Sequence, residues 1–95
     1  MIIRIVKMTF QQEAIPSFLE TFEKQKSFIA GFEGCSHLEL LRDKNQNNIF
    51  FTYSYWENEE ALARYRESDF FKQIWSKVKL WFDDKPLAWS LEKQG

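Results

Sequence analysis

The chain has 95 residues, which is the length of a single small domain, and we expect residues 1–95 to form one. Its 13 basic and 14 acidic residues are spread along the sequence and give a net charge of −1, so no basic stripe supports nucleic-acid binding. The sequence contains neither a long apolar run that would span a membrane nor a signal-peptide pattern at its start, so we expect a cytoplasmic protein without a membrane partner.

Residues 2–10 form the first predicted strand, and this strand is apolar on both faces. Ile5 is an apolar residue of the odd register, and Val6 is an apolar residue of the even register. A strand with two apolar faces is usually covered on both sides. Because a chain this short can supply helices for only one face of a sheet, we expect the other face to meet a second copy in a homodimer.

Residues 15–29 form a predicted helix, because apolar side chains recur there at spacings of three, four and seven. Pro16 lies in the first turn, where the missing N–H costs nothing. Gly31 and Gly34 are expected to end the helix and to allow a tight turn.

Two further strands follow, over residues 35–42 and 49–56, and the polar segment 43–48 joins them as a hairpin loop. The third strand is strongly aromatic and ends at Trp56, which we expect to pack under the next helix. The sequence therefore predicts an antiparallel pair whose aromatic side chains meet a helix.

Asn58 is the predicted N-cap of a short helix, and Ser68 or Asp69 is expected to cap its continuation, which ends near Phe82. Residues 86–91 form a short last strand. The resulting order, β-α-β-β-α-β, predicts an α+β ferredoxin-like fold: an antiparallel four-stranded sheet with both helices on one face.

His37 is the only histidine and a candidate general acid or base, because unperturbed histidine titrates near neutral pH. The alternative is a strand residue that is hydrogen-bonded at the sheet or dimer surface. Strand alternation places His37 in register with Cys35, which we interpret as a small buried cysteine rather than a nucleophile.

Lys7 is either a polar point in a cavity or a side chain that extends to the sheet edge. Arg4 occupies the opposite register and is expected at the dimer contact. Tyr65, Phe71 and Trp75 lie at helical spacing and form either core or the wall of a pocket for a flat organic molecule. With one histidine, one cysteine and no paired carboxylates at ligand spacing, no metal site is expected.

Four segments carry a resemblance that spans nearly the whole chain. They are the start at residues 2–7, the Phe-Glu-Gly-Cys turn at 32–35 with the strand after it, the Tyr-Trp-Glu-Asn-Glu-Glu-Ala-Leu run within 51–62, and Ser-Asp-Phe-Phe at 68–71. On these segments the chain resembles the antibiotic biosynthesis monooxygenase domain family of the dimeric α+β barrel superfamily.

The resemblance implies a homodimer with a pocket between each sheet and its helices. It also implies a monooxygenase that oxidises an aromatic or quinol-like compound with oxygen and needs no metal, flavin or other cofactor. In that setting Lys7 would stabilise a phenolate and His37 would accept its proton. Tyr65, Phe71 and Trp75 would contact the substrate, with Tyr65 and Trp75 stacking on it or hydrogen-bonding its oxygen.

Two alternatives on the same scaffold stay open, an isomerase or lyase using His37 or Lys7, and a non-catalytic ligand-binding dimer. Haem-degrading relatives use an asparagine, a tryptophan and a haem-ligating histidine at positions that align with Lys7, Tyr65 and Trp75. Because the asparagine and the ligand are missing, that reaction is not expected.

Overall fold

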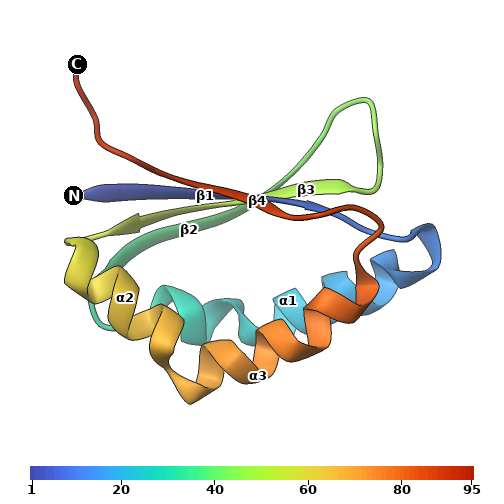
Figure 1. Cartoon of the computed structure of the whole chain (residues 1–95), viewed down its shortest axis with the longest axis horizontal. Coiled ribbons are helices and arrows are strands. Elements are labelled where there is room, and N and C mark those ends of the chain that lie inside the picture. The colour runs from blue at the N-terminus through green and yellow to red at the C-terminus, as the bar shows by residue number, and fades with distance from the viewer.

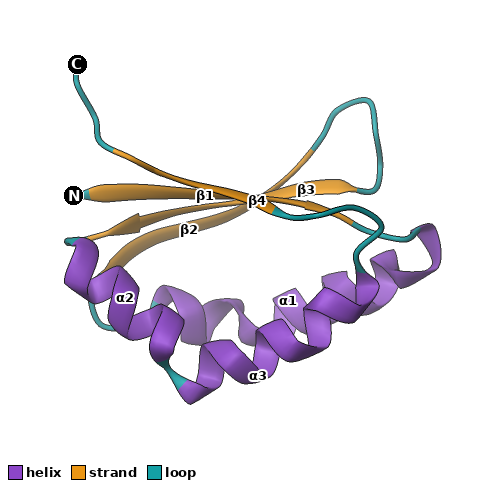
Figure 2. Ribbon diagram, viewed as in Figure 1, coloured by secondary structure: helices purple, strands orange, loops and turns teal.

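The computed structural model describes all 95 residues, and its elements follow the predicted order (Figure 1). The fold is α+β and ferredoxin-like: four antiparallel strands in the order β2-β3-β1-β4, with the helices on one side (Figure 2). The elements are β1 (Ile2–Thr9), α1 (Ile15–Ala30), β2 (Cys35–Arg42), β3 (Ile49–Trp56), α2 (Glu59–Glu67), α3 (Asp69–Val78) and β4 (Leu87–Leu91), with short 3-10 turns at Gln12–Ala14 and Lys79–Trp81.

The turn between α1 and β2 depends on one of the two predicted glycines. Gly34 has a φ of +91°, a conformation that side chains rarely adopt, and a Cβ there would lie 2.4 Å from the Cβ of Ala61. Gly31 has an ordinary φ of −88° and simply follows the last helical residue. The close approach at Gly34 allows the start of β2 to lie against α2.

The second helical region is divided into two capped helices. The Ala61 N–H donates to Asn58 Oδ1 at 2.8 Å, and the Phe71 N–H donates to Ser68 Oγ at 3.1 Å. Both caps were predicted, and Ser68 rather than Asp69 is the second one. The new cap lets the chain change direction, so α2 and α3 cover different parts of the sheet.

The core lies between the sheet and the helices in two clusters. Trp56 is 1% exposed, and its indole N–H donates to Ser54 Oγ at 3.0 Å, which satisfies the buried donor. It packs with α2 as predicted. The two clusters are Met8, Phe10, Ile15, Phe18, Phe50 and Val78, and Ile2, Trp56, Ala61 and Leu62.

A β-bulge corrects one predicted register. The pairing of β2 with β3 shifts between Cys35 and His37, so these residues do not share a face. Cys35 packs against the core cluster around Trp56, whereas the ring of His37 contacts Tyr55. Simple alternation along a strand cannot show such an extra residue.

None of the helices is long and apolar enough to cross a membrane.

Candidate binding cavity between the sheet and the helices

A cavity of about 420 Å³ lies between the sheet and the helices. Of its 20 lining residues, 15 are hydrophobic, and they come from β1, β2, β3 and all three helices as well as from the start of β4. This volume and this mostly apolar lining are typical of sites for small organic ligands. The cavity is therefore the candidate site.

One wall of the cavity is a continuous row of aromatic rings. Tyr65 stacks on Trp56 with ring centroids 4.8 Å apart, and Phe71 meets Tyr65 edge-on at 5.1 Å. Phe71 and Trp75 are nearly parallel, with an interplanar angle of 10° and centroids 5.8 Å apart. The structure thus brings together Tyr65, Phe71 and Trp75 in the lining of one cavity; their contact with a substrate stays a prediction.

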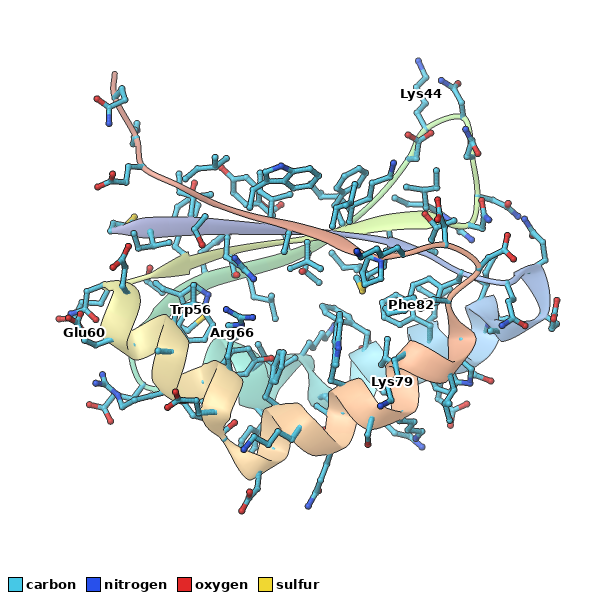
Figure 3. The ribbon with its side chains drawn as sticks, in the orientation of Figure 1. Lys44, Trp56, Glu60, Arg66, Lys79 and Phe82 are labelled. Atoms are coloured by element: carbon cyan, nitrogen blue, oxygen red, sulfur yellow. The ribbon has the colours of Figure 1, made fainter.

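Four of the remaining five lining residues are polar, and two of these are arginines. Arg4 projects from β1, where its Nη1 donates to Ser90 Oγ of the neighbouring strand at 2.9 Å. Arg66 reaches from α2 toward the sheet (Figure 3). Burial, and then the nearby charge of Arg66, lower the pKa of Arg4. The cavity thus combines an aromatic wall with a positively charged part.

The cavity holds no residue suited to accept a proton at neutral pH. Burial, with a smaller contribution from Cys35, raises the pKa of Tyr65 well above its usual value, so its phenol stays protonated and cannot act as a base at neutral pH. Burial also raises the pKa of the Cys35 thiol, which fits the prediction of an inert cysteine. The lining can stabilise an anion but contains no carboxylate or imidazole base.

His37 and Lys7 do not line this cavity. Lys7 lies in the odd register of β1, between Phe51 and Leu87, on the face away from the helices. His37 reaches the same face because of the bulge, and its Nε2 lies 2.8 Å from Glu39 Oε1. A catalytic role for either residue stays a prediction.

Arg4 was predicted at the dimer contact, and the cavity lining shows it on the helix-covered face instead. The sequence contained a usable signal, because the even register of the first strand is apolar except for Arg4, whereas the odd register includes Lys7 and Thr9. The sequence does not indicate that Arg66 lines a cavity. Its position one residue after Tyr65 in α2 gave no sign that it would turn toward the sheet.

A second hollow of about 610 Å³ runs along α1 and β2, but only eight residues line it, among them Leu19, Lys26 and Leu40. It is a surface groove without a cluster of reactive groups. No three His, Cys, Asp or Glu side chains lie close enough together to hold a metal ion.

Comparisons with known proteins agree with this architecture. The sequence profile of the family described as antibiotic biosynthesis monooxygenase matches residues 1–76. No curated protein sequence matches the chain. Among solved structures, a conserved protein from Methanosarcina mazei Go1 is 21% identical with a TM-score of 0.90, over 98% of this chain and 93% of that chain.

Two other solved structures carry a more informative description. A protein described as an antibiotic biosynthesis monooxygenase is 15% identical with a TM-score of 0.93, over the full length of both chains. A variant of SnoaB, a cofactor-independent oxygenase from Streptomyces nogalater, is 16% identical with a TM-score of 0.87, over 99% of this chain and 93% of that chain. At these identities the likeness shows the fold alone.

Proposed function

The chain belongs to the antibiotic biosynthesis monooxygenase family, and from that premise we propose that it is a monooxygenase acting on a small aromatic or quinol-like compound in the cavity described above. The observation that carries the proposal is the row of Trp56, Tyr65, Phe71 and Trp75 along one wall of that cavity. Such a wall suits the flat face of an aromatic ligand.

We further propose that the reaction needs no metal or flavin; SnoaB, a structural relative, is described as a cofactor-independent oxygenase. An electron-rich substrate that has lost a proton can reduce oxygen itself. Oxidation of a ring methylene to a carbonyl, for example, places one oxygen atom in the product and releases the other as water. The protein then has to bind the substrate, exclude water and stabilise the anion.

The polar residues of the cavity suit that task. Arg4 and Arg66 supply positive charge, and Ser54, whose oxygen accepts from Trp56, keeps its own proton to donate. Because the lining offers no base, the substrate proton leaves to solvent in this scheme. An isomerase using His37 or Lys7 would need one of them in the cavity, and neither lines it.

The open face of the sheet supports a homodimer. Four large apolar residues on or beside this face are more than two-fifths exposed in the single chain: Leu41 at 44%, Leu87 at 46%, Trp89 at 43% and Leu91 at 44%. Contiguous exposed apolar surface of this kind marks an interaction site. We propose that two copies pack these faces together, which would bury His37 and Lys7 in the interface.

The direct test is oxygen uptake by the metal-free protein with a panel of reduced quinols and polycyclic phenols, compared with autoxidation alone. Uptake should depend on the protein and fall about threefold in Trp75→Phe, because a phenyl ring keeps only part of the stacking surface of the indole. Trp89→Phe, on the open face, is the matched control and should keep the wild-type rate. Saturable binding without any uptake would instead support the non-catalytic binding dimer.

A further inference from the structure

The charge of the cavity is entirely of one sign. Among its 20 lining residues the only ionisable groups that are charged at neutral pH are Arg4 and Arg66. The ion pairs of the chain lie elsewhere, at Lys24–Glu20, Lys26–Glu23 and His37–Glu39, so neither arginine has a carboxylate partner. Two guanidinium groups therefore line a mostly apolar cavity without a carboxylate partner, Arg4 partly buried and Arg66 exposed.

The two arginines approach the cavity from opposite layers. Arg4 stands on β1 between Ser54 of β3 and Ser90 of β4, whereas Arg66 extends from α2 (Figure 3). Arg4 gives one hydrogen bond to Ser90, and its guanidinium carries five N–H groups, so most of its donors are left for another partner. Both arginines line the same cavity, and the charge of Arg66 contributes to lowering the pKa of Arg4.

Two like charges that line one mostly apolar cavity repel each other, and the partial burial of Arg4 adds a desolvation cost, so an anion that pairs with both is favoured. Guanidinium groups match oxygen anions especially well, because their N–H groups form paired, charge-assisted hydrogen bonds. An anion between Arg4 and Arg66 would remove both the repulsion and the unused donors. The aromatic row would meanwhile hold the apolar part of the same molecule.

We propose that Arg4 and Arg66 form an anion clamp, and that the ligand of the cavity is a planar aromatic molecule carrying an anionic oxygen group, either a carboxylate or an ionised phenol. The rings lie along Phe71 and Trp75, and the oxygens lie between the guanidinium groups. The catalytic role of the clamp rests on the proposed function, since the clamp would favour the ionised substrate that reacts with oxygen.

The first experiment compares two probes of nearly the same shape by calorimetry, 2-naphthoate and the neutral 2-naphthamide. The wild-type protein should bind naphthoate about tenfold more tightly, and Arg4→Gln and Arg66→Gln should each lower the affinity for naphthoate about tenfold while leaving that for naphthamide unchanged. Arg4→Lys should recover part of the loss, because the charge remains.

Arg64→Gln is the matched control, because Arg64 is an exposed arginine on the same helix that does not line the cavity. It should bind both probes like the wild type. Arg66 is exposed as well, so its replacement tests the clamp even if the Arg4 variant folds poorly. Equal affinities for the two probes, or the same loss in Arg64→Gln as in Arg66→Gln, would overturn the clamp, and so would failure of both probes to bind.

A second probe separates the two kinds of anion. 4-Nitro-1-naphthol is coloured when ionised, so its titration can be followed in the bound state. A clamp for phenolates should lower its apparent pKa by about one unit on binding, equal to a tenfold preference, and Arg66→Gln should abolish that shift. Naphthoate preference without the shift assigns the clamp to carboxylates. Because these assays measure binding, they can fail while oxygen uptake succeeds, or the reverse.

Discussion

The two faces of the sheet use similar side chains in different ways. On the helix-covered face Trp56 and Tyr65 stack in the core and the cavity, and Arg4 and Arg66 have no acidic partner. On the open face several polar groups are paired, since His37 Nε2 lies 2.8 Å from Glu39 Oε1 and the hydroxyls of Tyr53 and Tyr55 lie 3.3 Å apart. Lys7, on the same face, has no acidic partner.

This contrast separates a surface for packing from a surface for binding. Polar groups that are already paired can be buried against a second protein chain at little cost. Arg4 and Arg66 have no acidic partner in the cavity, and the proposed anionic ligand would pair with them. The predictions below test that separation, beginning with the largest effect.

The two tryptophans Trp56 and Trp89 provide the sharpest test. Trp56→Ala should lower the free energy of unfolding by about 3–5 kcal/mol, because it removes a buried ring and leaves a cavity. Trp89→Ala should cost the single chain about 1 kcal/mol or less, since the ring is 43% exposed there. Urea denaturation at low protein concentration measures both. Equal losses would show that the open face is also part of the core of the protomer.

A charged substitution on the open face should weaken the proposed dimer rather than unfold the protomer. Ile5 pairs with Tyr53 and Trp89 at the centre of that face, so Ile5→Asp should weaken the proposed dimer at least about a hundredfold through an unpaired buried charge. Light scattering at micromolar concentration should then give the monomer mass. Leu80→Asp is the control, at a residue 71% exposed on a 3-10 turn. A wild-type protein that is already a monomer would contradict the proposal.

The aromatic wall and the two arginines of the cavity should contribute to ligand affinity separately. Trp75→Ala should weaken the binding of 2-naphthoate and 2-naphthamide equally, about tenfold, because stacking does not depend on ligand charge. Calorimetry with both probes makes the comparison with the arginine variants direct. His37→Ala, on the other face, should leave both affinities unchanged. A selective loss of naphthoate binding in His37→Ala would place that histidine in contact with the ligand after all.

The sequence predicted the fold well because its signals are local. Helical periodicity, the caps at Asn58 and Ser68, and the apolar strand 2–10 each depend on neighbouring residues, and the structure confirms them, with the strand ending one residue earlier at Thr9. The continuation of the last helix to Phe82 was wrong only in detail, since α3 ends at Val78 and a 3-10 turn follows. Local hydrogen bonding and side-chain spacing carry this information.

The site was harder to predict because it depends on which way each strand faces. His37 and Lys7 were candidate site residues because their side chains can transfer a proton or carry charge. The bulge after Cys35 and the odd register of β1 place them on the open face. The even register of β1 is apolar except for Arg4, whereas the odd register includes Lys7, and this difference could have indicated that Arg4 faces the helices. Arg66 could not have been found, because its direction depends on how α2 packs on the sheet.

The smallest expected effect is a difference between the two faces in how the free energy of unfolding falls at alkaline pH. The pKa values of both Tyr65 and Tyr53 are raised, but burial is the main cause at Tyr65, whereas a hydrogen bond with Tyr55 is the main cause at Tyr53. A tyrosine whose pKa is raised by folding keeps its proton in the native state while the unfolded chain loses it above about pH 10. Stability is therefore complete below that pH and falls as the pH rises.

Tyr65→Phe should accordingly flatten the alkaline fall in the free energy of unfolding by up to about 1.4 kcal/mol per pH unit. Tyr53→Phe should change it less, because that ring is only part-buried in the single chain and its main cause is one hydrogen bond. Urea denaturation between about pH 9 and pH 11 measures the slopes. If the two variants gave the same slope in a monomeric background, burial would not distinguish the cavity face from the open one. A larger effect of Tyr53→Phe that appears only in the dimer would show that dimerisation converts the open face into a second core.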